Sequence, residues 1–270
     1  MEATSSTRLS ERLIVAGILI AVCVYGIFLA PPWQFVGIVE VFTITGLHEY
    51  FVIAEKKGVR LNKALGLFYG ALLPLAAYMP GEPLVLVIAL LSLFVYNFHR
   101  SLKDQALLST AVSLFGLVYV AWTFSFVVRI RQLPNGALWV FFTLFVTKIG
   151  DSAAFFVGRA FGRHKMVEHI SPRKSVEGAA ASFIASVGAA LAFKTLLPAS
   201  PLGHLAVLGV LIGILGQLGD LAESLIKRDA GVKDSGAVPG LGGVLDVMDS
   251  LLFTIPVVYA YTTTFYRILA

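Results

Sequence analysis

Carboxylate residues gather in one stretch of the chain, 216–250, which lies between two apolar runs. The run LGHLAVLGVLIGILG precedes this stretch, and SLLFTIPVVYAY follows it. Its side chains are therefore predicted to lie at or near the end of a membrane span, where charge is expensive and is usually kept for function. Six of the sixteen Asp and Glu residues fall in the stretch: Asp220, Glu223, Asp229, Asp234, Asp246 and Asp249.

Helical spacing places several charged residues on shared faces. Lys148 and Asp151 stand at i, i+3, and Asp246 and Asp249 repeat that spacing. For Lys148 and Asp151, the simpler interpretation is an ion pair that helps helices associate. A third set stands at i, i+3, i+4 and i+7 and forms a stripe along one helix face: Asp220, Glu223, Ser224 and Lys227. A solvated amphipathic helix end would show the same stripe.

Three helix ends are expected to bring four aspartates to one depth: Asp151, Asp220, Asp246 and Asp249. Clustered carboxylates repel one another unless a cation lies between them. Hard oxygen ligands suit Mg²⁺, which binds through one or two carboxylates plus substrate phosphates. The sequence therefore predicts a magnesium site with Asp220 and Asp246 as first choices and Asp249 and Asp151 as second. The five His residues lack zinc-ligand spacing.

Basic residues near these helix ends could bind phosphate. The segment 173–175 combines cations with a hydroxyl ahead of an expected helix start at Glu177–Gly178. The segment 227–233 adds further cations, and the glycine-rich turn 239–243 would let the backbone approach a nucleotide closely. The excess of cations in cytoplasmic loops accounts for part of this pattern. No GxxxxGK[ST] sequence occurs, which excludes a P-loop.

The composition is that of an integral membrane protein. Hydrophobic residues make up 57% and charged residues 14%, against roughly 25% charged in soluble domains, and the mean hydropathy is +0.84. The net charge of +5 suits contact with anionic lipid headgroups or an anionic substrate. Cys23 is the single cysteine, so no intrachain disulfide can form.

A helix needs about 20 apolar residues to cross the hydrocarbon. On this measure we expect an all-α, polytopic fold with about nine spans in a single membrane domain, 1–270. Within it, the helices of 1–135 carry no motif, and 136–270 supplies the catalytic helices and loops. The expected spans are 13–30, 33–54, 64–79, 84–99, 106–128, 137–158, 178–197, 202–222 and 247–266.

Nine spans place most Lys and Arg residues on one side of the membrane. Cytoplasmic loops carry such an excess, so the amino terminus and the site are expected to face the cytoplasm, and the carboxyl terminus the outside. The chain is thus expected in the inner or plasma membrane as a multi-pass protein. The opposite side has only Arg129, Arg131, Lys194 and Arg267.

Several motifs resemble those of a known family, the phosphatidate cytidylyltransferases, also called CDP-diacylglycerol synthases. The resemblance covers about residues 148–250, and its longer motif is highly specific. The motifs upstream are GDSAAFFVG at 150–158, FG at 161–162 and ISPRKSVEG at 170–178. Those downstream are SLIKR at 224–228, KDSG at 233–236, PGLGG at 239–243 and DVMDS at 246–250.

This resemblance implies transfer of the cytidylyl group of CTP to phosphatidate, giving CDP-diacylglycerol and pyrophosphate, with Mg²⁺ as cofactor. CTP, phosphatidate and membrane lipids are the implied partners, with no nucleic acid, and monomer or homodimer stays open. The implied catalytic residues are Asp220, Asp246, Asp249 and Lys227. The implied substrate-binding residues are Arg173, Lys174, Ser175, Ser224, Arg228, Lys233, Asp234, Gly240, Gly242 and Gly243.

Two positions depart from the family pattern: Leu241 replaces the usual His, and Val247 the usual Arg. A phosphate monoester has a second pKa near 6 and is already an anionic nucleophile at neutral pH, so loss of a His base is tolerable. A CTP-dependent enzyme with a prenol or archaeal lipid acceptor is one alternative. A transporter is another, although paired broken helices in two related halves would be expected of it.

Overall fold

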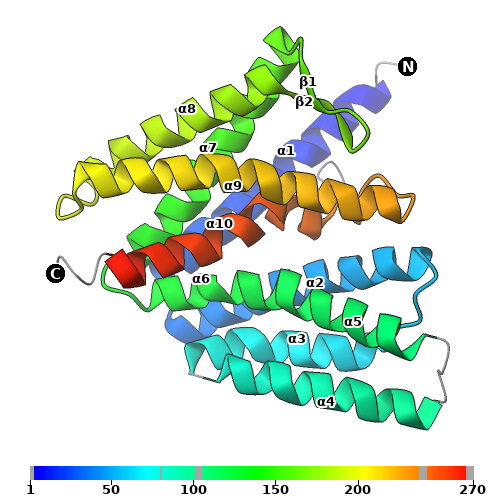
Figure 1. Cartoon of the computed structure of the whole chain (residues 1–270). Helices are drawn as coiled ribbons and strands as arrows, with labels where there is room; N and C mark the ends of the chain where they lie inside the picture. The colour runs from blue at the N-terminus through cyan, green and yellow to red at the C-terminus, as the bar shows by residue number, and fades with distance from the viewer. Residues whose placement is uncertain (1–2, 80, 101–104, 237–241, 266–270) are drawn as a thin grey trace. The chain divides into compact units, whose positions relative to one another are not determined.

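The computed structural model describes residues 3–79, 81–100, 105–236 and 242–265, which are helical almost throughout (Figure 1). The helices of the first half are α1 (Ala3–Val24), α2 (Pro32–Lys56), α3 (Lys63–Tyr78), α4 (Glu82–Arg100), α5 (Ala106–Gly116) and α6 (Thr123–Arg131). Those of the second half are α7 (Gly136–Phe161), α8 (Val176–Ala192), α9 (Leu202–Asp229) and α10 (Val244–Phe265). Short π- or 3₁₀-helical turns follow three of them: η1 (Tyr25–Leu29), η2 (Leu117–Trp122) and η3 (Phe193–Thr195).

The apolar helices make this a multi-pass membrane protein. Each of the nine predicted ranges overlaps a helix within the described residues, and the total of nine crossings stays a prediction. Among the described residues, six helices are long and apolar enough to cross a membrane: Pro32–Lys56, Ala106–Arg131, Gly136–Phe161, Val176–Thr195, Leu202–Asp229 and Val244–Phe265. Three shorter apolar helices are Leu13–Leu29, Lys63–Tyr78 and Glu82–Phe98.

The all-α prediction is confirmed, and one small sheet is the exception among the described residues. Strands β1 (Lys165–Val167) and β2 (Ser171–Ser175) pair antiparallel, with Lys165 opposite Ser175 and Val167 opposite Ser171. These residues were expected to form a loop, because the segment is polar, short and interrupted by Pro172. The hairpin lies between α7 and α8, where it carries part of the predicted phosphate-binding segment.

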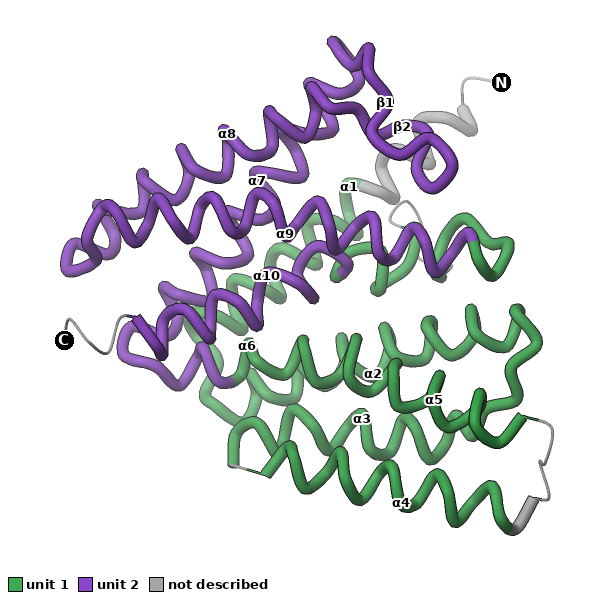
Figure 2. Tube along the Cα trace, viewed as in Figure 1, with its two compact units in different colours: residues 1–128, 229–248 green, residues 129–228, 249–270 purple. Residues whose placement is uncertain are grey.

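The chain divides into two compact units (Figure 2). Unit 1 comprises residues 1–128 and 229–248, and unit 2 comprises 129–228 and 249–270. The single membrane domain expected for 1–270, with its division at about residue 135, stays a prediction. In the structure the segment 229–248 groups with the amino-terminal helices. Each unit therefore holds part of the motif region.

Polar contacts join neighbouring helices of unit 1. Asn97 of α4 donates from Nδ2 to Thr110 Oγ1 of α5 at 2.8 Å, and the hydroxyls of Tyr69 (α3) and Ser92 (α4) lie 2.6 Å apart. Such hydrogen bonds help membrane helices to associate where water is absent.

In unit 2, small residues let the helices approach closely. A Cβ on Gly209 of α9 would lie 2.8 Å from the Cα of Val187 on α8, and a Cβ on Gly150 of α7 would lie 2.4 Å from Ser186 Oγ. Only a glycine fits such contacts without displacing its neighbour. Close packing of this kind is typical of membrane helices, which gain little from apolar burial against one another.

Candidate active site

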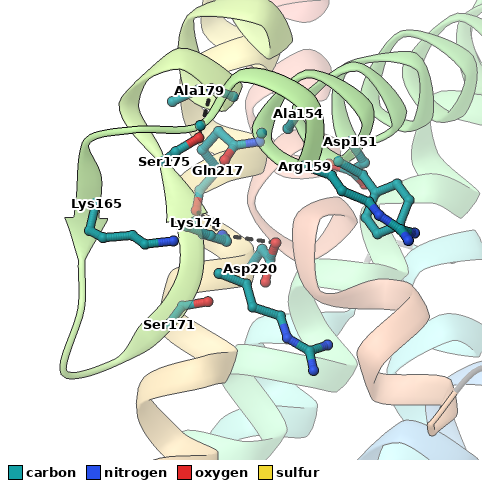
Figure 3. A pocket seen from close by; sticks show the side chains of 15 residues that line it. Asp151, Ala154, Arg159, Lys165, Ser171, Lys174, Ser175, Ala179, Gln217 and Asp220 are labelled. Atoms are coloured by element: carbon teal, nitrogen blue, oxygen red, sulfur yellow. Dashed lines mark hydrogen bonds and ion pairs between the residues drawn. The ribbon is translucent and has the colours of Figure 1, made fainter.

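A pocket of about 740 Å³ lies within unit 2, lined by α7, the β1–β2 hairpin, the start of α8 and α9 (Figure 3). Apolar atoms of Ala154 and Phe155 lie on its α7 side. The pocket combines cations for an anionic ligand with carboxylates for a metal ion. Its charged lining residues are Asp151, Arg159, Lys165, Arg173, Lys174 and Asp220.

Lys174 connects the hairpin to α9 across this pocket. Its Nζ lies 2.8 Å from Asp220 Oδ2 and donates to the Gln217 carbonyl oxygen at 3.3 Å (Figure 3). The lysine side chain is 14% exposed and the aspartate side chain 37%, so the pair lies at the edge of the protein interior. An ammonium has three donors, and these two contacts leave capacity for an oxygen of a bound ligand.

The end of the hairpin is fixed by helix-capping contacts. Ser175 is the N-cap of α8, and its buried hydroxyl accepts from the Gly178 N–H at 3.1 Å. A side-chain acceptor at the N-cap, here Ser175, satisfies an N–H that has no partner within the helix. The Glu177 carboxylate accepts from the N–H groups of Arg163 and His164, ahead of β1, at 3.1 and 3.2 Å. The predicted substrate-binding Ser175 thus lines the pocket and also caps a helix.

A second ion pair adjoins the pocket at Asp151. The predicted sharing of one α7 face by Lys148 and Asp151 is confirmed, since Nζ lies 3.0 Å from Oδ2. Ser250 of α10 completes the contact: its hydroxyl donates to Asp151 Oδ2 at 2.8 Å and accepts from Lys148 Nζ at 3.0 Å. Sequence reasoning placed Ser250 in a motif and gave it no role, because its partners lie about 100 residues away.

Asp249 joins these groups from α10. It is 8% exposed and interacts electrostatically with Asp220, Lys148 and Asp151. A Cβ on Gly219 of α9 would lie 2.5 Å from the Asp249 carbonyl oxygen, so α9 and α10 are in close contact here. Three of the four predicted aspartates therefore gather in unit 2, on three different helices.

The fourth, Asp246, lies on α10 one turn before Asp249 and belongs to unit 1. Its Oδ2 accepts from the Ser235 N–H at 2.9 Å and from the Ser235 hydroxyl at 2.7 Å. Gly242, with φ of +87°, adjoins the same carboxylate, and a Cβ there would lie 2.7 Å from Oδ2. Asp246 thus contacts Ser235 and Gly242 ahead of its own helix, and its role as a metal ligand stays a prediction.

The catalytic candidate Lys227 and the other predicted substrate-binding residues differ in their surroundings. Lys227 is buried in an ion pair with Glu223, one turn earlier on α9. Arg228 donates from Nε to the Ile170 carbonyl oxygen at 3.2 Å, which links α9 to the hairpin. Ser224 is half-buried, whereas Lys233 and Asp234 are exposed; Gly243 lies in the described part of the loop, and Gly240 and Leu241 lie outside the described residues.

The donor set fits a magnesium ion that is completed by its substrate. Asp151, Asp220 and Asp249 supply hard carboxylate oxygens, the ligand type that Mg²⁺ prefers. Within the described ranges, no three His, Cys, Asp or Glu side chains are placed to hold a metal by themselves. Mg²⁺ commonly takes one or two carboxylates and fills its remaining positions with phosphate and water oxygens, in agreement with this arrangement.

Comparison with known proteins identifies the protein family. A family model described as the cytidylyltransferase family matches residues 10–265. The chain belongs to the cytidylyltransferase family. The resemblance predicted from the motifs at 148–250 is confirmed, and the match extends across the helices that carry no motif.

Individual relatives within the cytidylyltransferase family carry the name phosphatidate cytidylyltransferase. The protein from Synechocystis is 31% identical over 285 residues, covering 93% of this chain and 96% of the relative. The one from Chlamydia muridarum is 36% identical over 186 residues, covering 62% and 61%. The one from Bacillus subtilis is 39% identical over 146 residues, covering 53% and 54%. The chain thus spans little more than half the length of the latter two and nearly all of the first.

Proposed function

We propose that this protein transfers the cytidylyl group of CTP to phosphatidate, giving CDP-diacylglycerol and pyrophosphate for phospholipid synthesis. The name phosphatidate cytidylyltransferase, which its relatives carry, supports the reaction. The observation that carries the proposal is the pocket of unit 2, where cations and carboxylates from α7, α9 and the β1–β2 hairpin lie together. Separated charges of both signs suit a reaction in which two phosphate anions must meet.

The chemistry requires charge neutralisation more than a base. A phosphatidate oxygen attacks the α-phosphorus of CTP, a new P–O bond forms, the bond to the β-phosphate oxygen breaks, and pyrophosphate leaves with that electron pair. The attacking phosphate monoester is largely ionised at neutral pH. No proton has to be removed from it, and this accounts for the tolerated Leu241 in place of a His.

Different residues of the pocket would bind the substrate phosphates and the metal ion. Lys174 and Arg173 bind phosphate oxygens from the hairpin side, and Asp220 and Asp249, supported by Asp151, would hold Mg²⁺ on the helix side. Bound there, Mg²⁺ supplies positive charge to the phosphate oxygens on which charge accumulates. The Lys148–Ser250 contact holds Asp151 in place beside these groups.

We further propose that the pocket faces the cytoplasm in a multi-pass protein of the cell membrane. CTP is a cytoplasmic solute, and phosphatidate can enter from the inner leaflet. The excess of Lys and Arg in alternate loops, including the hairpin segment, supports this orientation.

The decisive experiment uses the full chain purified in detergent and supplied with CTP and Mg²⁺. Pyrophosphate release should depend on added phosphatidate and should stop with EDTA and return with Mg²⁺. A lipid product carrying labelled cytidine should form in parallel. Equal release with a prenyl or archaeal lipid acceptor and none with phosphatidate would overturn the assigned acceptor, and no CTP consumption with any lipid would overturn the reaction.

A further inference from the structure

Glu49 of α2 contacts the beginning of α10, within unit 1. Its carboxylate is buried, with 8% of the residue exposed. Oε1 accepts from the Val244 N–H at 3.0 Å, and Oε2 accepts from the Leu245 N–H at 2.8 Å. The first N–H groups of a helix have no partner within it, and the positive end of the helix dipole favours an anion there. Glu49 therefore caps α10 from a position about 195 residues earlier in the chain.

Two glycines ahead of α10, Gly236 and Gly243, lie against the same carboxylate. A Cβ on Gly236 would lie 2.2 Å from Glu49 Oε1, and a Cβ on Gly243 would lie 2.5 Å from Oε2. Neither contact could be relieved by rotating a flexible side-chain end, because the Glu49 oxygens are already held by the backbone of α10. The two motif glycines thus have a physical partner in a helix of the amino-terminal half.

Ser235 joins this cap to a candidate metal ligand. Its hydroxyl lies 2.9 Å from Glu49 Oε2 and 2.7 Å from Asp246 Oδ2, and its N–H donates to Asp246 Oδ2 at 2.9 Å. A displacement of Glu49 would therefore be felt at Asp246 through one intervening residue.

We propose that Glu49 is a positioning residue for cytidylyl transfer. It contacts residues 235–236, Gly243 and the first turn of α10, the helix that carries Asp246 and Asp249. It touches no reacting atom in this role and acts through Ser235 and the α10 backbone. The expected effect on turnover rests on the proposed function. The capping of α10 by Glu49 rests on the contacts alone.

The test is Glu49→Gln in the full chain. The amide keeps the size of the side chain, yet it presents an NH₂ group to N–H donors that need an acceptor. Loss of an outer hydrogen-bonding partner of a metal ligand costs about 10- to 100-fold in activity. We expect kcat to fall by that factor, the Mg²⁺ concentration for half-maximal rate to rise, and KM for CTP to change far less than kcat. Unchanged kcat and Mg²⁺ dependence would overturn the proposal.

Glu40→Gln is the matched control. Glu40 lies on the same helix, nine residues or about 13 Å earlier, and undergoes the same chemical change. It should retain wild-type kinetics. A loss equal to that of Glu49→Gln would show that α2 merely tolerates no amide and would count against positioning.

Ser235→Ala adds a second variant that does not depend on the folding of the first. If Glu49 acts through Ser235, the double variant should be no slower than the slower single variant, because neighbours in one contact chain are not additive. Multiplied losses in the double variant would mean independent actions and would refute the pathway.

Amide hydrogen exchange separates this inference from the proposed reaction. In Glu49→Gln, exchange of the peptide 242–248 should quicken at Val244 and Leu245, whereas Glu40→Gln should match the wild type. If the wild type fails to consume CTP, the proposed function falls and this measurement still decides the cap. Unchanged exchange at those two amides would exclude the positioning role, even if the kinetics of Glu49→Gln were altered.

Discussion

Two lysines at or near the pocket each pair with a carboxylate of the proposed magnesium site. Lys174 pairs with Asp220, and Lys148 pairs with Asp151, both through a single Oδ2. Such pairing orients the aspartate side chains before any substrate arrives. In the proposed reaction, Lys174 and Lys148 would contact phosphate oxygens, and Asp220 and Asp151 would be free to bind or support Mg²⁺. This exchange of partners would need only side-chain movements.

Replacing single aspartates by Asn tests this arrangement. Asp220→Asn, Asp249→Asn and Asp246→Asn each keep the shape of the side chain and remove its charge. We expect turnover to fall at least about 100-fold, the scale of losing one electrostatic contact to a developing charge. Pyrophosphate release by the purified, folded variants is the measurement.

The control for this set is Asp229→Asn at the end of α9. Asp229 pairs with Lys57 in an exposed ion pair at 2.8 Å, with side chains 65% and 50% exposed, and such pairs contribute little. Its activity should stay near that of the wild type. Near-normal rates in Asp220→Asn or Asp249→Asn would remove that residue from the proposed metal site.

Lys174→Met is expected to impair substrate use more than stability. The change removes the cation of the hairpin and leaves Asp220 without this partner, at a side chain that water can still reach. We expect kcat/KM for CTP to fall about 100-fold. Steady-state kinetics would show it, with Lys57→Met, at the exposed pair, as a comparison that should be unaffected. Equal kinetics in both variants would exclude Lys174 from phosphate binding.

Residue contacts could be predicted from the sequence only where they are local. The Lys148–Asp151 pair follows from helical spacing, and so does the Glu223–Lys227 pair at i, i+4. Glu49 was noticeable only as a buried charge in an apolar helix, and nothing local indicates that it caps a helix about 195 residues later. The glycine-rich turn was expected to let the backbone approach a nucleotide, whereas the structure places Glu49 against Gly236 and Gly243.

At the scale of elements, the close contact between α9 and α10 depends on Gly219, which has no side chain. A Cβ on Gly219 would lie 2.5 Å from the Asp249 carbonyl oxygen, a rigid backbone atom. Gly219→Ala should therefore push the helices apart, lower stability by about 1–3 kcal/mol and reduce activity through displaced Asp249 and Asp220. Thermal unfolding in detergent and pyrophosphate release measure the two effects.

Gly203→Ala provides a comparison on the same helix. No atom lies within 4 Å of a Cβ at Gly203, so the substitution adds helix propensity without a clash. Its unfolding temperature should be unchanged or slightly higher. If both alanine variants behaved alike, close α9–α10 packing would not be the reason for Gly219.

Helices were predictable here, and the hairpin was not. Long apolar runs bounded by charge or proline leave few alternatives in a bilayer, so the nine predicted ranges all overlap helices within the described residues. The β1–β2 pair spans only a few residues, is polar and contains Pro172, and it is held by Glu177 through backbone contacts that no pattern reveals. The division into two units was equally hidden, since no change of composition marks residue 229 or 248.

For the whole molecule, sidedness is the property that the reaction demands. Because Cys23 is the single cysteine, Cys23→Ser gives a background for site-directed labelling. In that background, Gln132→Cys should react with a membrane-impermeant maleimide on intact cells. His169→Cys, at an exposed position in the hairpin turn, should react only after permeabilisation. The reverse pattern would place the pocket outside and contradict the proposed cytoplasmic site.

The three shorter apolar helices of unit 1 have a consequence for the surrounding lipid. Lys63–Tyr78 has 16 residues, which corresponds to about 24 Å, against about 30 Å of hydrocarbon in a typical bilayer. Where such helices cross, hydrophobic mismatch must be relieved by thinning of the bilayer or by Lys63 reaching toward the headgroups. Reconstitution into vesicles of graded acyl-chain length should therefore give the highest turnover in thin membranes, and a flat response would show that unit 1 leaves its lipid undeformed.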